Sequence, residues 1–346
     1  MPSEVTVQVA TVDAILPHPD PETTALEIIK VQGWQLVAGK GLYTVGEKLV
    51  YVPPEVVLTD ALVERKGIKY LAPGNRVHTI RLRGELSFGL TFPPDKDWPV
   101  GTNVAEYYGI EKYVPPLRFT AADAIEDHPY FIKYTSLANL RDYPHVFADG
   151  EKVIVMEKLH GASGRVALIN GERMAGSYEL RRKQPESDAP DKASVYWHIW
   201  EMPGIEQLVC QLAKTHTQVI VFGEVYGSKV MGGFPYDAPK QDVKFAVFDI
   251  MVDGVYQNYE QVRSLCFLFG VQTVPLLGVF SYSLPLMHDL AEGKTMLGGQ
   301  TIREGVVVRS LLEQSSLEVK RKVLKYHSDS WLFKKSKHKV EDYTDQ

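Results

Sequence analysis

The stretch Val153–Val166 (VIVMEKLHGASGRV) constrains the fold most, because it joins an apolar run to a charged pair and a turn of small residues. The run Val153–Met156 is short, β-branched and uncharged, which is typical of a buried strand. Such a strand presents Lys158 at the rim of a sheet, and Gly161 lets the backbone approach a ligand closely there. The lysine amine is therefore a candidate nucleophile. The alternative is a strand-end lysine whose charge simply reaches water.

Length and composition limit what the chain can be. Its 346 residues allow two domains with separate cores, and its apolar fraction of 45% is that of a globular protein. The net charge of −5 argues against general nucleic-acid coating. No apolar run reaches membrane-spanning length, and the first residues lack a signal-peptide pattern. Because Cys210 and Cys266 are isolated, we expect a cytoplasmic protein without membrane contact, with the nucleus or an organelle as alternatives.

Charge is distributed unevenly along the chain. Between Lys320 and Lys339 nearly every charged residue is basic, and Asp329 is the lone acid. A basic segment on an acidic body can bind phosphates locally, whereas a solvated helix face is the commoner explanation. The composition leaves both interpretations open.

Residues 3–106 are predicted to be all-β. Turn material such as Pro17–Pro21 separates short β-branched runs, namely Val5–Val9, Leu26–Val31, Gln35–Val37, Lys48–Val52 and Val77–Arg83. About five short strands suit a small barrel, and an OB-fold is the economical choice. Arg76, Arg81 and Arg83 could follow a nucleic-acid backbone. Arg81 and Arg83 could equally form the solvent face of an edge strand.

A domain boundary follows the predicted barrel. Pro115-Pro116 can neither continue a helix nor donate to a strand ladder, so we expect domains at 1–108 and 120–346 with a linker at 109–119. A short helix is predicted over residues 134–143, before Pro144. Farther along, the sequence predicts a hairpin at Asn170-Gly171, a broken helix over 196–215, a helix over 261–269, and strands over 219–222, 243–250 and 306–309.

Several predicted strands hold a charged residue beside glycine. Glu157-Lys158 precedes Gly161, Glu224 stands between two glycines, and Glu304 precedes Gly305. The strand 243–250 places Phe248 beside an aspartate. Carboxylates against apolar strands are disfavoured unless they are paired, solvated or near a cation. Each alone could be a strand end that reaches solvent, but their joint occurrence with one lysine favours a single site.

This series resembles the covalent nucleotidyltransferase superfamily of ATP-dependent ligases and capping enzymes. Lys158 in KLHG fits the KxxG signature, Glu224 the third motif and Phe248 the aromatic motif after it. Glu304 fits the fourth motif and Lys325 the fifth. Residues 28–52 and 81–90 resemble the OB domain of RNA ligases of the Naegleria and Deinococcus type. The implied fold is α+β, an OB-like barrel followed by an adenylyltransferase domain of antiparallel sheets flanked by helices.

The resemblance implies ATP as the AMP donor, Mg²⁺ or Mn²⁺ as the metal, and Lys158 as the catalytic nucleophile, whose amine must be unprotonated to attack. Glu224 and Glu304 would hold the metal, mostly through its waters. Glu157 or its backbone would contact the adenine edge, Phe248 would stack on adenine, and Lys325 would contact the α-phosphate. The implied nucleotide-binding residues are Glu157, Leu159, Gly161, Arg181, Arg182, Glu224, Phe248, Glu304 and Lys325. One of Arg181 and Arg182 would reach the ribose or the acceptor phosphate.

Some positions depart from the pattern of relatives. His327 stands where relatives often carry a second lysine, which makes Lys320 and Lys322 rival anchors, although both could be solvated charges. His160 stands where many relatives have aspartate, but RNA ligases with KxHG exist. The roles of His160, Ser163 and His327 are left open.

Domain order favours an RNA ligase over the other members of the superfamily. DNA ligases and capping enzymes place an OB domain after the fifth motif, and the roughly twenty residues after Lys325 are too few for a barrel. The resemblance therefore implies a monomer that acts on RNA ends or on a nicked duplex containing RNA. A DNA ligase, a guanylyltransferase and a non-catalytic nucleic-acid-binding module are the alternatives.

Overall fold

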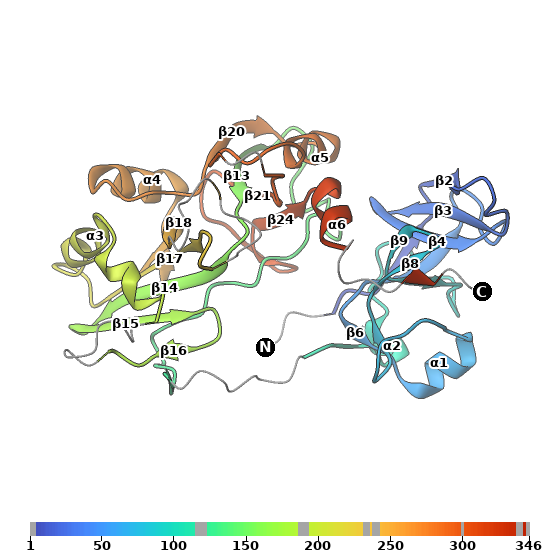
Figure 1. Ribbon diagram of the computed structural model, residues 1–346, viewed down its shortest axis with the longest axis horizontal. Helices are drawn as coiled ribbons and strands as arrows, with labels where there is room; N and C mark the ends of the chain where they lie inside the picture. Colours follow the sequence, from blue (N-terminus) through green and yellow to red (C-terminus); the bar gives the residue numbers. More distant parts are fainter. Residues whose placement is uncertain are drawn as a thin grey trace. The chain divides into compact units, whose positions relative to one another are not determined.

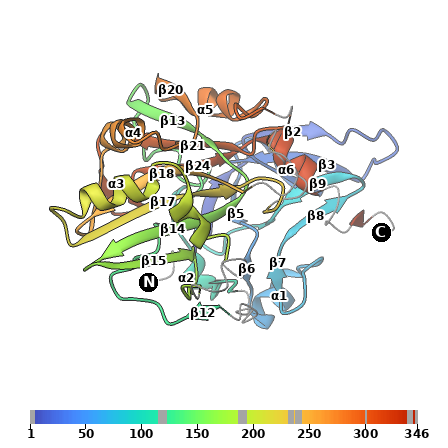
Figure 2. The same cartoon turned by 60° about the vertical axis from the view of Figure 1, so that its left-hand side comes forward.

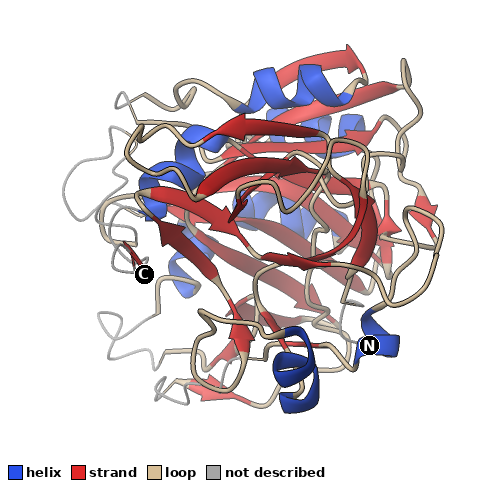
Figure 3. Cartoon of the chain, turned by 90° about the vertical axis from the view of Figure 1, so that its right-hand side faces the viewer, coloured by secondary structure: helices blue, strands red, loops and turns tan. Residues whose placement is uncertain are grey.

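A computed structural model describes residues 5–114, 123–185, 194–230, 236, 243–298, 301–336 and 342–343. Its contacts divide the chain into two compact units, Met1–Leu117 with Leu332–Gln346, and Arg118–Trp331. Strands dominate both units and helices are few (Figure 3). The expected α+β class is confirmed. No helix among these residues is long and apolar enough to cross a bilayer.

The first unit consists of short strands around two apolar clusters. Three-stranded sheets in the orders β1-β5-β10, β2-β3-β4, β11-β6-β7 and β25-β8-β9 build it. Its strands are β1 Gln8–Thr11, β2 Ala14–Pro17, β3 Leu26–Val31, β4 Trp34–Gly39, β5 Lys48–Val52, β6 Val56–Val57, β7 Arg76–Val77, β8 Thr79–Leu82, β9 Glu85–Phe88, β10 Leu90–Phe92, β11 Glu111–Lys112 and β25 Asp342–Tyr343. Its helices are α1 Asp60–Lys66 and α2 Ala105–Tyr108.

The prediction that residues 3–106 are all-β is wrong at α1. The Thr59 hydroxyl accepts a hydrogen bond from the Leu62 N–H at 3.3 Å, and Gly67 ends the helix with a φ of 62°. A threonine cap and a terminal glycine are both helix signals. The helix was missed because it is only seven residues long and buries only Leu62, so it shows no apolar periodicity.

The arginines of the barrel are held within the first unit. Strand β8 lies between β9 and β25, so the interpretation of Arg81 as part of an edge strand is wrong. Arg81 donates to the Gly84 carbonyl at 2.6 Å, while Arg83 lies in the turn with a φ of 52°. Arg76 lies 3.1 Å from a Glu55 oxygen. These contacts leave a role in RNA binding as a prediction.

The ends of the first unit differ from the expected domain limits. Strand β11 lies within the expected linker 109–119 and pairs with β6, whereas Pro115-Pro116 lies outside the described residues. Residues from Leu332 onward were expected in the second domain but group with the first unit. There Leu332 and Phe333 pack against a barrel core, and β25 adds to β8 in parallel.

The second unit contains two antiparallel sheets. The larger has the order β12-β16-β15-β14-β17-β18-β19, the smaller the order β20-β13-β21-β24, and a hairpin pairs β22 with β23. Its strands are β12 Ala124–Ile125, β13 Lys152–Lys158, β14 Ala162–Ile169, β15 Glu172–Ser177, β16 Arg181–Arg182, β17 Gln218–Tyr226, β18 Lys244–Val252, β19 Val255–Tyr256, β20 Leu276–Ser281, β21 Gly305–Ser310, β22 Ser315–Ser316, β23 Lys320–Arg321 and β24 Val323–His327.

Helices cover both sheets of the second unit. They are η2 Trp197–Glu201, α3 Ile205–Leu212, α4 Tyr259–Leu268 and α5 Leu284–Ala291, whereas α6 Asp329–Ser336 begins in this unit and continues into the first unit at Leu332. Helices α3 and α4 lie on one face of the larger sheet, where they share its apolar cluster (Figure 1). Helix α5 runs alongside the four-stranded sheet (Figure 2). The antiparallel sheets flanked by helices are therefore as predicted.

In the second unit, the predicted hairpin and the predicted broken helix are confirmed, whereas one predicted helix is wrong. Asn170 and Gly171 form the predicted hairpin turn with φ values of 50° and 83°, and the helix over 196–215 breaks before α3 as expected. The helix over 134–143 is wrong. The Lys325 N–H donates to the Ala138 carbonyl at 3.0 Å, and the Leu140 N–H donates to the Lys325 carbonyl at 2.8 Å. Bridging to β24 therefore replaces helical hydrogen bonds.

A buried charge cluster joins the two sheets. Asp249 of β18 is fully buried, and its Oδ2 lies 2.8 Å from Nη2 of Arg321. The Tyr134 hydroxyl donates to the same oxygen at 3.0 Å, and Nη1 of Arg309 lies 3.6 Å away. Removal of one partner leaves buried charges with fewer opposite charges around them, so the stability of the cluster is sensitive to single substitutions.

Replacing Asp249 with asparagine is expected to destabilise the second unit by about 1.5–3 kcal/mol, since charge-assisted hydrogen bonds are lost and Arg309 and Arg321 keep only the Glu313 carboxylate among the described residues. Urea unfolding followed by tryptophan fluorescence measures this. The matched control is Asp289→Asn, because that side chain is 78% exposed and pairs only with His288 among the described residues. The control should change the free energy of unfolding by less than about 0.5 kcal/mol. Equal effects of the two variants would contradict a structural role for the cluster.

Candidate active site

Lys158 lies where the chain passes from one sheet to the other. It is the last residue of β13, opposite Gly305 of β21 in the smaller sheet, whereas β14 of the larger sheet begins at Ala162. The turn 159–161 therefore connects the two sheets, and buried Leu159 anchors it. The Lys158 side chain is 23% exposed, so its amine is sheltered yet accessible.

Gly161 fits this turn because no side chain could. A Cβ atom there would lie 2.3 Å from the Val225 carbonyl oxygen and 2.9 Å from Cγ of Glu224. Since real Cβ atoms are not found so close to backbone, only glycine allows this approach. The close contact holds the turn after Lys158 directly against Glu224.

Glu304 forms an ion pair with the lysine. Its Oε1 lies 3.0 Å from Nζ of Lys158 and 3.5 Å from Nε2 of His327, and its Oε2 lies 3.5 Å from Nδ1 of His160. Burial raises the pKa of Glu304, but Lys158 and the two histidines outweigh burial and hold it well below its usual range. Glu304 is therefore ionised at neutral pH.

The pKa values of Glu224 and His327 are also shifted, in both cases mainly by burial. Burial raises the pKa of Glu224 to about 7, Lys158 opposes this, and the charge of Glu304 adds to it. Burial lowers the pKa of His327 to about 4 although Glu304 favours its charged form, so the imidazole is neutral at neutral pH. Two carboxylates with diverging pKa values around one lysine are typical of a functional site. Lys158 alone does not neutralise both, which fits a site for a divalent cation.

Glu157 is buried on the other side of the strand end. Its Oε2 accepts a hydrogen bond from the Met296 N–H at 2.8 Å and lies 3.8 Å from Nε of Arg303. Its Oε1 is buried without a hydrogen-bond partner among the described residues. Buried polar atoms are normally satisfied, so this oxygen is suited to accept a hydrogen bond from a ligand.

Phe248 lies at a β-bulge of the larger sheet. The register of β17 and β18 shifts between Phe222 and Gly223, which makes Phe248 the extra residue. Both Phe248 and the neighbouring Asp249 then contact Tyr134, whose ring centroid lies 4.8 Å from that of Phe248. Bulges re-aim side chains beside active sites, and this one leaves a partly exposed ring with an aromatic backing.

The remaining predicted residues lie in two places. Lys325 lies opposite Val307 in β24, two residues before His327. Because side chains two residues apart in a strand lie on the same face, Lys325 shares the face from which His327 contacts Glu304. Arg181 is paired with Glu172, whereas Nη1 of Arg182 lies 2.7 Å from Asp123. No described contact brings either arginine to Lys158, and their roles stay predictions.

The rival lysines lie elsewhere. Nζ of Lys322 is 2.7 Å from Glu151, which precedes the start of β13, the end remote from Lys158. Lys320 is exposed in the β22–β23 hairpin with a φ of 63°. Neither is placed to replace Lys325.

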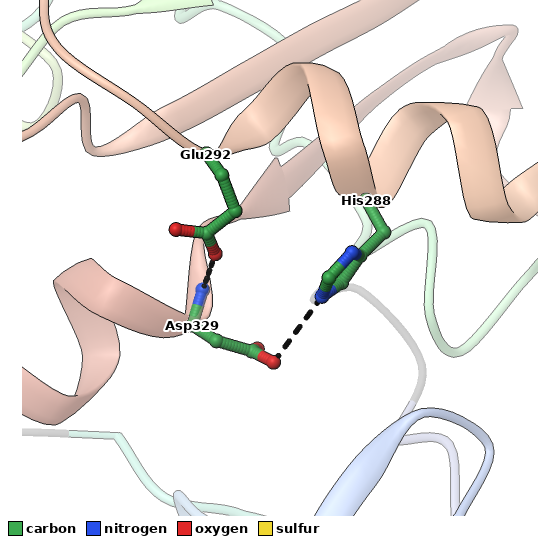
Figure 4. Close-up of side chains that lie close together, drawn as sticks. All are labelled: His288, Glu292 and Asp329. Carbon is green, nitrogen blue, oxygen red and sulfur yellow. Dashed lines mark hydrogen bonds and ion pairs between the residues drawn. The ribbon is translucent and has the colours of Figure 1, made fainter.

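A second group of possible metal ligands has a structural explanation. His288, Glu292 and Asp329 lie close together (Figure 4). Glu292 Oε1 accepts from the backbone N–H of Asp329 at 2.6 Å and so caps α6. The Asp329 carboxylate is 2.6 Å from the guanidinium of buried Arg141. These contacts satisfy the group without a metal.

The sequence analysis missed Tyr236. Its hydroxyl accepts a hydrogen bond from the His160 N–H at 2.6 Å, directly in the turn after Lys158. It belongs to no motif and no periodic segment, so the sequence carries no signal for it.

Comparisons with protein families give two matches. A model described as RNA ligase matches residues 151–327, which is more than half of the chain. An OB-fold domain model matches residues 6–94, which confirms the expected barrel fold. A search of curated proteins gave no match.

Solved structures of Naegleria gruberi RNA ligase share the fold. A variant with AMP and Mn gives a TM-score of 0.71 at 23% identity, covering 95% of this chain and 98% of that one. A variant with ATP and Mn gives 0.70 at 24% identity, covering 97% and 99%. The ligase with PPi gives 0.71 at 23% identity, covering 98% and 99%.

Proposed function

Because the chain belongs to the RNA ligase family, we propose that it joins RNA ends with ATP as the AMP donor and Lys158 as the nucleophile. The carrying observation is the Lys158 amine, held 3.0 Å from Glu304 beside a glycine turn that packs on Glu224. The AMP, ATP and Mn of the similar Naegleria gruberi structures support this choice of donor and metal.

In the first step the Lys158 amine attacks the α-phosphorus of ATP, and pyrophosphate leaves. The amine must be unprotonated, and Glu304 orients it toward the phosphate. Mg²⁺ or Mn²⁺ would neutralise the phosphate oxygens. Glu304 and Glu224 would hold this ion, and Lys325 would contact the α-phosphate. Gly161 keeps the turn after Lys158 packed against Glu224.

The second and third steps transfer AMP and seal the RNA. A 5′-phosphate of RNA attacks the phosphorus of lysyl-AMP, which frees Lys158 and forms an adenylylated RNA end. A 3′-hydroxyl then attacks that end, forms the phosphodiester and releases AMP. We propose a nicked duplex as substrate, with RNA on the 3′-hydroxyl side, where a 2′-hydroxyl can be sensed. Arg181 or Arg182 would contact the ribose or the acceptor phosphate.

Nucleotide choice would rest on Glu157 and Phe248. Oε1 of Glu157, which has no hydrogen-bond partner in the described part of the chain, is suited to accept a hydrogen bond from the amino group of adenine. Guanine has a carbonyl oxygen at that position, so this oxygen and Oε1 of Glu157 would face each other as two acceptors without a hydrogen between them. Phe248 would stack on the base, supported from behind by Tyr134.

Radiolabelled ATP and GTP, tested side by side, examine this proposal. We expect covalent labelling from ATP only, and labelling from GTP instead would indicate a guanylyltransferase. Glu157→Gln should raise the KM for ATP about 10- to 100-fold, because glutamine is uncharged and has one acceptor oxygen, which cannot serve both the Met296 N–H and adenine. The control Glu179→Gln, which changes a carboxylate that is 56% exposed, should leave the KM unchanged. An unchanged KM in Glu157→Gln would contradict the adenine contact.

A further inference from the structure

Given Lys158 as the nucleophile, which rests on the function proposed above, we propose that Tyr236 is a positioning residue that holds this lysine through the turn that follows it. Tyr236 is separated from the turn by more than 70 residues of sequence, yet its hydroxyl contacts the turn directly.

The backbone of the turn depends on side-chain partners, and Glu224 of β17 accepts one hydrogen bond from the Gly161 N–H. Strand β13 ends at Lys158 in the smaller sheet, and β14 starts at Ala162 in the larger one. Residues 159–161 therefore lie outside the strand ladders, while a buried N–H without a partner is strongly disfavoured. The Tyr236 hydroxyl accepts the hydrogen bond of the His160 N–H, with an oxygen–nitrogen distance of 2.6 Å. It thus fixes the backbone two residues beyond Lys158.

Tyr236 is itself held firmly. It is only 3% exposed, and its ring stands edge-on to that of Tyr226, with centroids 5.5 Å apart and planes at 87°. Tyr226 ends β17, two residues after Glu224. Tyr236 therefore connects the turn after Lys158 with the strand that carries Glu224.

The phenol is neutral in this place. Burial raises the pKa of Tyr236, the His160 N–H partly opposes this, and the charges of the three carboxylates Glu304, Glu157 and Glu224 raise it further. The neutral hydroxyl can accept the backbone hydrogen bond across the working pH range. Its position near all three carboxylates is consistent with a role at the site itself.

A positioning role affects some steps and not others. Lys158 Nζ forms its bond to phosphorus in the first step and loses it in the second. In the third step the 3′-hydroxyl attacks an RNA end that is already adenylylated, and Lys158 forms no bond. Loss of the Tyr236 hydroxyl should therefore slow lysine adenylylation and spare the sealing of adenylylated RNA.

The test is Tyr236→Phe, which removes only the hydroxyl. We expect lysyl-AMP formation to be about 10- to 100-fold slower in kcat, since small misplacements of a reacting group have such effects, with an unchanged KM for ATP. RNA that already carries a 5′-adenylate should be sealed at the wild-type rate, which also shows that the variant is folded.

The matched control is Tyr282→Phe. Tyr282 is also buried, and its hydroxyl donates to the Pro144 carbonyl at 2.7 Å. It follows β20, whose last residue pairs with the first residue of β13, so it lies at the opposite end of β13 from Lys158. It should lose stability like Tyr236→Phe but keep normal lysyl-AMP formation. Lysyl-AMP formation at the wild-type rate in Tyr236→Phe, or equal loss in both reactions, would overturn the positioning role. Absence of lysyl-AMP in the wild-type protein would instead overturn the proposed function.

Discussion

Replacing Lys158 with alanine is expected to abolish the covalent AMP adduct. Lys325 would contact the α-phosphate from the face of β24 that it shares with His327, whereas Lys322 is paired with Glu151 and Lys320 lies in an exposed hairpin. We therefore expect no other lysine to accept AMP in place of Lys158. The variant should still fold, since the lysine is partly exposed and strand β13 keeps its ladder partners on both sides. Incubation with labelled ATP and metal, followed by denaturing electrophoresis, measures the adduct.

The control for this experiment is Lys152→Ala. Lys152 begins the same strand and contacts the Ser281 hydroxyl at 3.0 Å, so its loss tests the strand without touching the site. It should label like the wild-type protein. Lys158→Ala should also keep sealing RNA that is already adenylylated. An adduct of normal yield in Lys158→Ala would refute the assignment of the nucleophile.

Replacing Glu304 with glutamine should slow lysine adenylylation by roughly 10²- to 10³-fold, the range seen when one preorganised electrostatic group is removed from an active site. Glutamine keeps the size but loses the charge that orients Lys158 and that would hold the metal. The rate of lysyl-AMP formation across a titration of Mg²⁺ or Mn²⁺ measures the effect, and a shift to higher metal concentrations is expected.

Glu318→Gln is the matched control, because the Glu318 side chain is 53% exposed and pairs with His145 at the surface. Its metal titration should overlay that of the wild-type protein. If Glu304→Gln kept full metal-dependent adenylylation, the metal-binding role of Glu304 would fail, while the role of Lys158 would stand.

The site pattern could be predicted from the sequence because apolar strands, charged strand ends and glycine turns are each determined by neighbouring residues. Glu304 lies near Lys158 because the next residue, Gly305, pairs with Lys158 across the smaller sheet. Glu224 lies near the turn after Lys158 because Gly161 allows the close approach. The barrel followed from strand length and turn residues, whereas the α+β class followed from the resemblance to known ligases. The roles of these residues in catalysis remain proposals that the experiments above address.

What the sequence could not predict depends on tertiary contacts. Residues 134–143 have helical propensity, but bridging to β24 near Lys325 overrides it. The bulge at Phe248 depends on the register of β17 and β18. Arg321 belongs to a basic stretch expected at the surface or on phosphate, yet it is buried against Asp249. Tyr236 is 76 residues away in sequence from His160, whose N–H donates to its hydroxyl.

The most direct test of the whole account is sealing of a nicked RNA duplex with a labelled 5′-phosphate and a 3′-hydroxyl. With ATP and Mg²⁺ or Mn²⁺, the label should become resistant to phosphatase as the nick is joined, and an adenylylated RNA end should form on the way. Omission of ATP should prevent both. A label that stays sensitive to phosphatase at every metal and ATP concentration would contradict the account.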